Sequence, residues 1–265
     1  MAKDVAVKKE NVVALHGGFA QAAGIGFEEI TAQDLSVPFL RILAQLSPQV
    51  NKRDGAYVQG AEAGMIFNTV ANEVYDGEKG IEVVPCYYSR RLVEWRPRDQ
   101  GGGYVGSYTA DDPIAKRATK DDRGNDVLPN GNLLTNTAQF FVLLLHPELG
   151  PQRCLITMTS TQLKKARKWL TQMQSLTGRD PNGKLYTMPM MSNVYTLRTV
   201  EERNDKGSWF GWEVSRARAL DESKQEDVEL FELGYAFAQS VRAGDVKVKE
   251  EPEHGGQVMD DDAPF

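Results

Sequence analysis

Seven short apolar runs limit the fold of this chain more than any other feature of its sequence. The runs are rich in β-branched and aromatic residues and are separated by turn-forming glycine, proline, asparagine and aspartate, which is typical of strands. They span residues 65–70, 81–88, 92–96, 137–145, 154–159, 194–200 and 209–215. A β-rich fold is therefore expected, with Ser89-Arg90 forming a tight hairpin or a bulge between two of the strands.

Three further segments have the apolar spacing of helices. They span residues 37–46, 160–177 and 224–241. Pro38 stands at the start of the first, as is common at helix N-termini. Either Ser160 or Thr161 is a suitable N-cap for the second, and Gly178 is expected to stop it. The last helix carries acidic residues in its early turns, where the helix dipole favours them.

The order of these elements is three or four strands, a helix, two strands and a final helix. A five-stranded Greek-key barrel with a helix between its third and fourth strands has this order, and that is the OB-fold. We therefore expect a β-rich α+β fold containing an OB-fold-like five-stranded barrel with added helices. A generic α+β fold is the alternative.

The composition along the chain predicts its domain organisation. Residues 1–20 lack sustained periodicity and are expected to form a flexible N-terminal arm. Residues 21–241 are expected to form a single OB-like domain, with a long Gly/Asp-rich loop insertion at about 97–135. Residues 242–265 are charged and poor in large apolar side chains, which predicts a disordered acidic tail.

Apolar runs and cysteine content indicate the compartment. The longest apolar run, residues 140–145, is far shorter than the roughly 20 residues that span a bilayer. The N-terminus lacks the apolar core of a secretory signal. Cys86 and Cys154 both lie in strand-like runs, where a disulfide is compatible with the sequence but not required by it. We expect a protein of a reducing cytoplasm, without a membrane partner.

The net charge of −6 conceals an uneven distribution. Residues 221–265 carry 13 acidic and 4 basic side chains, a net charge of −9, so the preceding 220 residues carry +3. Residues 160–220 alone carry 11 basic and 5 acidic side chains. Such asymmetry indicates a polyanion partner together with an acidic interaction tail. An acidic terminus that serves solubility explains the charge equally well.

Catalytic motifs are missing from the sequence. His16, His146 and His254 have no recognised metal-binding or triad spacing with the cysteines. The triple glycine at 101–103 lacks the lysine that follows in a phosphate-binding loop. Aspartates at 111, 112, 121 and 122 have the chemistry to bind a divalent metal, as nucleases do, but a solvated loop is the favoured explanation. We expect no enzymatic activity, no metal and no cofactor.

Basic residues interleaved with aromatic ones are the strongest functional signal. Unpaired nucleic acid requires both, because cations neutralise phosphates and flat rings stack on bases at about 1–3 kcal/mol per base. The candidate DNA-binding residues are Tyr87, Tyr88, Arg90, Arg91, Trp95, Arg96 and Arg98 in the first group, Lys164, Lys165 and Lys168 on the predicted helix, and Arg198, Trp209 and Phe210 in the last strand pair. Alternation along a strand places Arg91, Val93 and Trp95 on one face.

Each of these groups also has a purely structural explanation. Any single aromatic ring here is more readily explained by burial in the core than by base stacking. The lysines of the helix are equally consistent with a solvated helix surface. Trp209 and Phe210 stand beside a predicted turn, which makes them candidates for exposed stacking.

The last residues, Met259-Asp260-Asp261-Asp262-Ala263-Pro264-Phe265, resemble the acidic tip of bacterial single-stranded DNA-binding proteins. The resemblance implies that Asp260, Asp261, Asp262, Pro264 and Phe265 bind partner proteins, with the Phe265 ring and terminal carboxylate entering a basic-rimmed apolar pocket. Ala263 departs from that family, in which a larger aliphatic residue is usual.

The body of the chain resembles a different group. Residues 37–50 and 65–98 are similar to single-stranded DNA-binding proteins of tailed bacteriophages, including those of the N4-like type. This resemblance implies sequence-independent binding and protection of single-stranded DNA in phage replication, recombination and repair, in the host cytoplasm. The tip would recruit replication or recombination proteins, or host RNA polymerase. A homo-oligomer is compatible with this expectation.

Two alternative functions follow from the same sequence. The first is a phage transcription regulator that binds host RNA polymerase through the acidic tail. The second is a metal-dependent nuclease or annealing recombinase that uses the aspartates of the loop at 111–122.

Overall fold

Two long antiparallel strands form the centre of the fold. The computed structural model describes residues 24–31, 34–205, 207–246 and 248. Strand β4 (Ile81–Trp95) pairs with β8 (Leu133–His146) along almost its whole length. The hairpin considered at Ser89-Arg90 is wrong, because both residues continue the ladder, while a register shift lies between Pro85 and Tyr87. The predicted strands 81–88 and 92–96 are therefore one strand.

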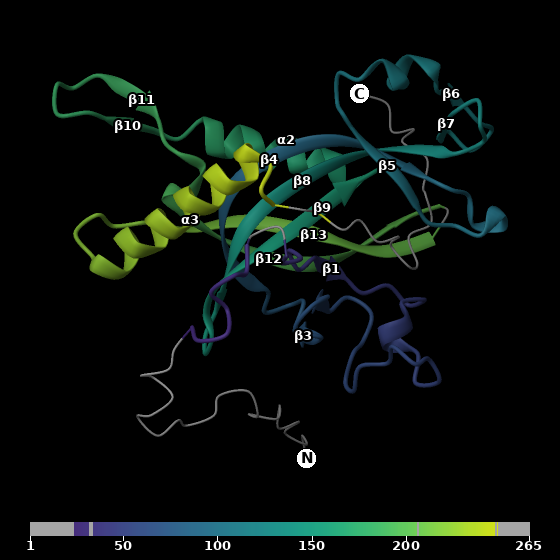
Figure 1. Cartoon of the computed structure of the whole chain (residues 1–265), viewed down its shortest axis with the longest axis horizontal. Helices are drawn as coiled ribbons and strands as arrows, with labels where there is room; N and C mark the ends of the chain where they lie inside the picture. Colours follow the sequence, from purple (N-terminus) through teal and green to yellow (C-terminus); the bar gives the residue numbers. More distant parts are fainter. Residues whose placement is uncertain (1–23, 32–33, 206, 247, 249–265) are drawn as a thin grey trace.

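Six more strands complete an eight-stranded antiparallel sheet that curls into a half-barrel (Figure 1). Its path runs β13-β12-β4-β8-β7-β6, with β5 added beside β4 and β9 beside β8. The bounds are β5 (Tyr104–Thr109), β6 (Thr119–Lys120), β7 (Asp126–Val127), β9 (Gly150–Thr159), β12 (Asn193–Asn204) and β13 (Gly207–Ala219). The segment 97–135 is thus largely structured, with β5, β6 and β7 joined to the sheet. The β-rich α+β class is confirmed.

A three-stranded sheet consists of β1 (Leu40–Ile42), β2 (Ile66–Asn68) and β3 (Glu73–Tyr75). The helix predicted at 37–46 is wrong, because β1 occupies its centre. Phe39 forms a parallel bridge with Leu155 of β9, and the amide of Leu155 donates to the carbonyl of Pro38 at 2.8 Å. Strand pairing on both sides therefore overrides the helical spacing of this apolar run.

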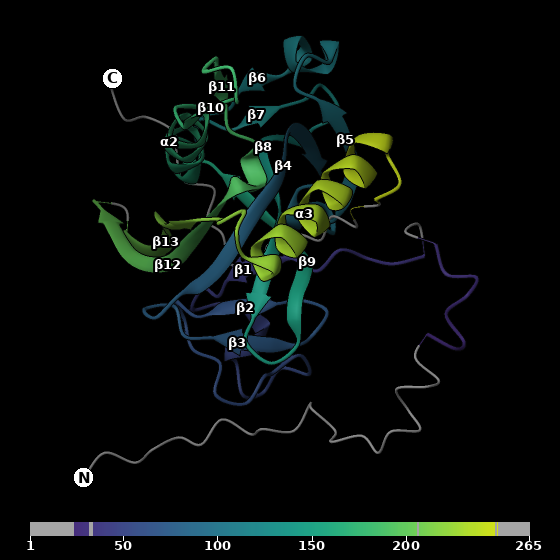
Figure 2. The same cartoon turned by 90° about the vertical axis from the view of Figure 1, so that its left-hand side faces the viewer.

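Helices α2 (Gln162–Gln174) and α3 (Gln225–Ala243) lie on opposite faces of the large sheet (Figure 2). Both predicted helices are confirmed, although α2 ends before Gly178, which lies in a strand. Along the chain, α2 is followed by a separate hairpin, β10 (Thr177–Arg179) paired with β11 (Leu185–Thr187). Short 3-10 helices span Pro48–Val50, Arg98–Gln100, Pro113–Arg117 and Met190–Ser192. Among the described residues, no helix has the length and apolar character needed to cross a membrane.

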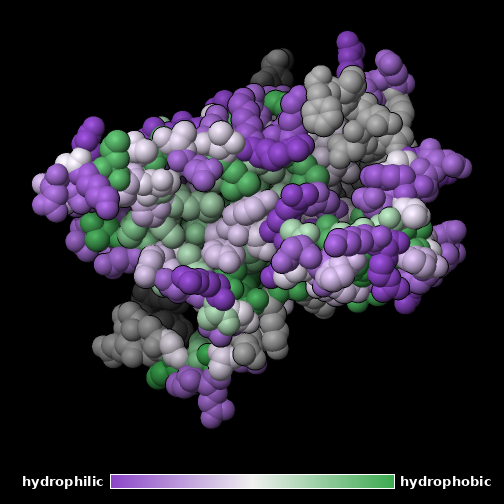
Figure 3. Space-filling view, turned by 90° about the horizontal axis from the view of Figure 1, so that it is seen from above, coloured by the Kyte–Doolittle hydropathy of each residue, from purple (hydrophilic) through white to green (hydrophobic). Residues whose placement is uncertain are grey.

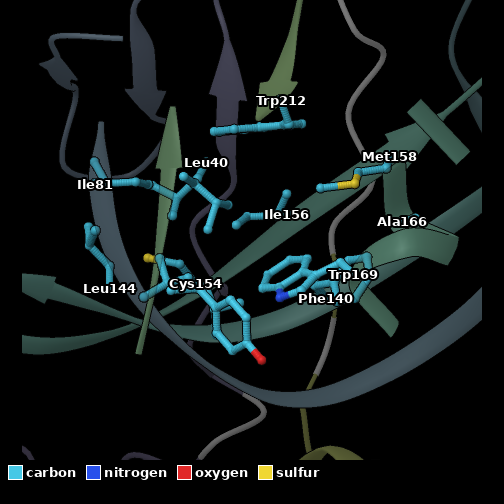
Figure 4. Close-up of a cluster of buried hydrophobic side chains, with 14 of the residues drawn as sticks. Leu40, Ile81, Phe140, Leu144, Cys154, Ile156, Met158, Ala166, Trp169 and Trp212 are labelled. Carbon is cyan, nitrogen blue, oxygen red and sulfur yellow. The ribbon is translucent and has the colours of Figure 1, made fainter. Parts of the chain in front are cut away.

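Two apolar cores lie on the two faces of the sheet because its central strands carry large apolar residues at successive positions. On one face, Trp169 of α2 stacks on Phe140 with ring centroids 4.4 Å apart (Figure 4). On the other face, Phe237 of α3 meets Phe141 edge-on. Cys154 belongs to the first core and Cys86 to the second, and both are free. Burial raises the pKa of each thiol to about 12, so both stay protonated at neutral pH.

The small sheet docks on β12 through a close backbone approach. The amide of Thr199 donates to the carbonyl of Gly77 at 2.9 Å, and its hydroxyl donates to the carbonyl of Gly64. A Cβ atom at position 77 would collide with both the carbonyl of Gly64 and the Thr199 hydroxyl. Only glycine therefore fits at position 77 without moving the small sheet away from β12.

The N-terminal arm (1–20) and most of the acidic tail, including its tip, lie outside the described residues. The last helix ends at Ala243, two residues beyond the predicted domain boundary. Gly244, in the left-handed conformation, caps it and accepts no side chain without strain.

Candidate nucleic-acid interface

Strand β4 separates the candidate residues between its two faces. The predicted sharing of one face by Arg91, Val93 and Trp95 is confirmed, since Leu92 belongs to a buried cluster on the other face. The bulge after Pro85 packs the half-buried Tyr87 against the core beneath α3 and the half-buried Tyr88 against the core beneath α2. Two adjacent tyrosines therefore serve different faces.

A groove of about 430 Å³ lies on the α3 face, where this helix ends above the sheet. Three strands and the end of α3 build it. The lining residues are Tyr87, Ser89 and Arg91 of β4, Tyr104 and Ser107 of β5, Gln139 and Phe141 of β8, and Val241, Arg242, Gly244, Val246 and Val248 at and after the end of α3. The groove thus brings together two predicted residues, Tyr87 and Arg91, with residues that sequence reasoning did not select.

The groove combines cationic, hydroxyl and aromatic groups. Arg91 is half-buried, and its Nε donates to Ser89 Oγ at 3.1 Å, which fixes the guanidinium over the sheet. Arg242 adds a second cation from the last turn of α3. Tyr87 packs edge-on against Phe141 with centroids 6.1 Å apart, so the aromatic floor is held in place by the core.

An aromatic pair extends this face toward the end of β4. Trp95 and Tyr104 are paired across β4 and β5, with ring centroids 5.9 Å apart and planes at 73°. Tyr104 is 44 % exposed, whereas Trp95 is half-buried. Tyr104 was not among the candidates, because its strand pairing with Trp95 cannot be read from the linear pattern.

The other arginines of this region, Arg90, Arg96 and Arg98, do not line the groove. Arg90 is exposed on the opposite face, and its Nε donates to Asn136 Oδ1 at 2.8 Å. Tyr88 packs against Phe140 in the core, and desolvation raises the pKa of its hydroxyl. Arg96 and Arg98 are exposed just beyond β4, at the entrance to the 3-10 helix.

The lysines of α2 lie on the other side of the sheet. Lys164 and Lys168 are exposed, but Lys165 forms an ion pair with Glu202 of β12. Glu202 also accepts a hydrogen bond from the indole of Trp209 at 2.8 Å. This hydrogen bond holds the indole of Trp209 in place. Trp209 is half-buried, so the expected exposure for stacking is wrong.

Two further candidates lie on the β12–β13 hairpin. The ring of Phe210 lies against Gly64, where an added Cβ would be 2.7 Å from it, so Phe210 too is half-buried rather than exposed. Arg198 is exposed, and its Nε makes a long contact of 3.5 Å with the carbonyl of Lys79. Neither residue joins the groove.

A buried carboxylate attaches the 97–135 segment to the sheet. Glu94 is 3 % exposed and accepts hydrogen bonds from the side chains of Tyr108 at 2.6 Å, Asn130 at 3.0 Å and Asn132 at 2.6 Å. Burial alone would raise the pKa of Glu94, but these three bonds outweigh it and hold the pKa below its ordinary range. A cavity of about 160 Å³ beside it is also lined by Arg117. The sequence pattern did not reveal this cluster.

The aspartates considered for metal binding form local bonds in their loops. Asp112 Oδ1 accepts from the amide of Ile114 at 2.8 Å, which caps a 3-10 helix. Asp121 accepts from the amides of Arg123 and Asn125. Within the part of the chain that the structure describes, no three His, Cys, Asp or Glu side chains gather as a metal site would require.

A half-barrel sheet with one helix on each face defines a β-rich α+β protein, and its α3 face carries a groove lined by aromatic rings and guanidinium groups. Residues 7–247 match the family described as Pam3 phage gp34-like protein, and the chain belongs to this family. The bacteriophage origin implied by the resemblance is thereby confirmed. No curated protein and no solved structure matches the chain.

Proposed function

We propose that this protein binds single-stranded DNA without sequence preference and protects it during phage replication, recombination and repair in the host cytoplasm. The observation that carries the proposal is the groove on the α3 face, where Arg91 and Arg242 lie beside Tyr87 and Tyr104. Cations on one surface with the exposed ring of Tyr104 and the half-buried ring of Tyr87 suit a polyanion with unpaired bases. The role is one of binding and recruitment rather than catalysis.

The dimensions of the surface support this assignment. Tyr87 and Trp95 share one face of β4 and lie about 26 Å apart along it, at about 3.3 Å per residue. Arg91 stands midway between them. This length accommodates several unpaired nucleotides, in line with the roughly 4–16 that one OB-fold covers. We propose that the curled sheet binds in the OB-like manner, with the DNA strand carried on the α3 face where that helix ends.

Side chains on this face suit backbone contacts rather than the reading of base edges. Ser89 and Ser107 offer hydroxyl groups that bond phosphate or sugar, and the guanidinium groups bond phosphate. Rings of Tyr87 and Tyr104 stack on any base, because every base has a π face. Binding is therefore expected to be tolerant of sequence and sensitive to salt.

The acidic tail begins beside the groove. Val246 and Val248 line it, and Glu250 and Glu251 follow in the sequence after Lys249. We propose that the tail competes with DNA for the basic groove, an effect that salt weakens by screening. Phe265 and the preceding aspartates, Asp260 to Asp262, then recruit replication or recombination proteins.

Fluorescence anisotropy of labelled oligo-dT at low and moderate salt tests the proposal. Tight binding to oligo-dT, weaker binding to duplex DNA and a loss of affinity with salt are expected. Negligible oligo-dT affinity, with a host-protein pulldown that depends on Phe265, would instead favour a regulator that binds host RNA polymerase. Magnesium-dependent loss of the labelled DNA would establish a nuclease.

A further inference from the structure

The β10–β11 hairpin projects from the body of the protein directly after α2 (Figure 1). Residues 162–187, which include both elements, carry six basic side chains and a single acidic one, Asp180. The basic residues are Lys164, Lys165, Arg167, Lys168, Arg179 and Lys184. All but Lys165 are exposed. We call residues 162–187 the basic arm.

Apolar and aromatic side chains lie exposed within the basic arm. Tyr186 is 43 % exposed and Leu185 55 % exposed. The Tyr186 ring lies against Gly178 of the partner strand, where an added Cβ would be 2.7 Å from the ring. An aromatic ring packed over a strand glycine stabilises a hairpin, which explains the contact of Tyr186 with Gly178. It does not explain why the rest of the Tyr186 side chain is exposed. The whole face of the molecule that is seen from above also shows hydrophobic residues between hydrophilic ones (Figure 3).

Hydrogen bonds hold the hairpin in one conformation. Asp180 Oδ1 accepts from the amides of Asn182 and Lys184, each at 2.9 Å. The guanidinium of Arg179 donates to the carbonyl of Gly183 at 2.8 Å. The ring of Tyr186 is therefore presented on a preorganised strand, which lowers the entropic cost of binding.

We propose that the basic arm is a second binding surface for single-stranded DNA, with Tyr186 as a stacking platform and Lys164, Lys168 and Lys184 as phosphate contacts. The charge of the arm is complementary to a polyanion, and the exposed ring of Tyr186, two residues after Lys184, suits unpaired bases. The inference rests on the proposed function. It adds a site separate from the groove, because α2 and α3 cover opposite faces of the sheet.

Photocrosslinking with oligo-dT containing 5-iodo-deoxyuridine tests the arm directly, with the full chain and peptide mapping by mass spectrometry. Crosslinks to the peptide that contains Tyr186 are expected, in addition to crosslinks in the groove. Crosslinks in the groove with none in the arm would overturn this inference and leave the proposed function intact. Absence of oligonucleotide binding altogether would overturn both.

Substitutions provide the second readout. Tyr186→Ala is expected to weaken oligo-dT binding about fivefold or more, as one lost stacking contact does, whereas Tyr186→Phe keeps the ring and the affinity. Tyr235→Ala is the matched control, because Tyr235 is 53 % exposed on the acidic helix α3. Equal affinities for the Tyr186→Ala variant and wild type would contradict the inference.

A second variant tests the arm without altering the hairpin, so that local unfolding of the hairpin cannot explain its effect. Lys164→Ala with Lys168→Ala leaves the hairpin untouched and should lower the slope of log affinity against log salt by about 1.4, or about 0.7 per lost contact to a single strand. An unchanged slope would contradict the role of these lysines in binding DNA. If an acidic host protein bound the basic arm in a salt-sensitive manner and no DNA crosslinks formed there, the surface would be assigned to a protein partner instead.

Discussion

Trp95 and Tyr104 meet edge-on across the β4–β5 pair, with ring centroids 5.9 Å apart. The pair lies on the same sheet face as Arg91, so an aromatic surface and a cation are presented together. Trp95 thereby becomes a tryptophan reporter within the candidate interface. Trp169 and Trp212 are buried in the core, and the indole of Trp209 is bonded to Glu202.

Removal of the Tyr104 ring should weaken DNA binding without unfolding the protein. Tyr104→Ala removes a partly exposed ring at the edge of the groove, and the expected loss of oligo-dT affinity is about five- to tenfold. Anisotropy titration measures it, with Tyr235→Ala as the control. Unchanged affinity in a variant with a normal thermal unfolding midpoint would remove Tyr104 from the interface.

Two adjacent arginines provide an internal comparison of the two sheet faces. Arg91 lines the groove, whereas Arg90 bonds Asn136 on the opposite face. Arg91→Ala should weaken oligo-dT binding and lower the salt slope by about 0.7, while Arg90→Ala should leave both nearly unchanged. Both residues were candidates from the sequence, which did not separate their effects. If Arg90→Ala weakened binding more than Arg91→Ala, the DNA would lie on the opposite face of the sheet, and the proposed groove would be contradicted.

Deletion of residues 257–265 should separate the two proposed activities. The tip carries three aspartates, which are expected to oppose DNA binding at the groove. Affinity for oligo-dT at low salt should therefore stay the same or rise, while capture of partner proteins is lost. Phe265→Ala in the full chain is the finer variant, since it keeps the charge. Loss of DNA binding on deletion would count against competition by the tail.

The carboxylate of Asp227 links the start of α3 to β13. It is 4 % exposed and accepts two hydrogen bonds from Arg218, at 2.7 and 2.8 Å, and one from the amide of Asp221. Asp227→Asn should lower the free energy of unfolding by about 1–3 kcal/mol at pH 7. Glu226→Gln, on the exposed side of the same first turn, should change it by less than about 0.5 kcal/mol.

The pH dependence of this effect has a definite sign. Hydrogen bonds from Arg218 hold the pKa of Asp227 below its ordinary range. The stabilisation is therefore present above the unfolded-state pKa of about 3.9 and is lost as the pH falls through the lower folded-state value. Denaturant unfolding of wild type and Asp227→Asn should show a difference that narrows below about pH 4. A difference that grows at low pH would contradict the assignment.

Local patterns were sufficient to predict the two covering helices and the strands β2, β4, β8, β9, β12 and β13. The stripe of α2 and the alternation of β12 and β13 depend on neighbours that are close in sequence. The segment at 37–46 was mispredicted because its partners, β2 and Leu155 of β9, are distant in the chain. Ser89-Arg90 likewise looked like a break until pairing with β8 showed one continuous strand.

The candidate site was predictable only in its residue types. Tyr87 and Arg91 were selected because aromatic and basic residues alternate there. Arg242 and Tyr104 were not, because the groove depends on α3 ending above β4 and β5. Ion pairing by Lys165 and burial of Trp209 both arise from Glu202, a single residue whose contacts follow from the tertiary fold.

Titration of the intrinsic tryptophan fluorescence with oligo-dT, at two salt concentrations, tests the central claim most directly. Binding in the groove should quench the fluorescence with saturation, more weakly at the higher salt, because stacking alters the environment of Trp95. Most of this signal should disappear in Trp95→Phe, which keeps an aromatic ring, and persist in Trp209→Phe. Saturable binding with quenching that is unchanged in Trp95→Phe, or no binding at either salt, would contradict the account.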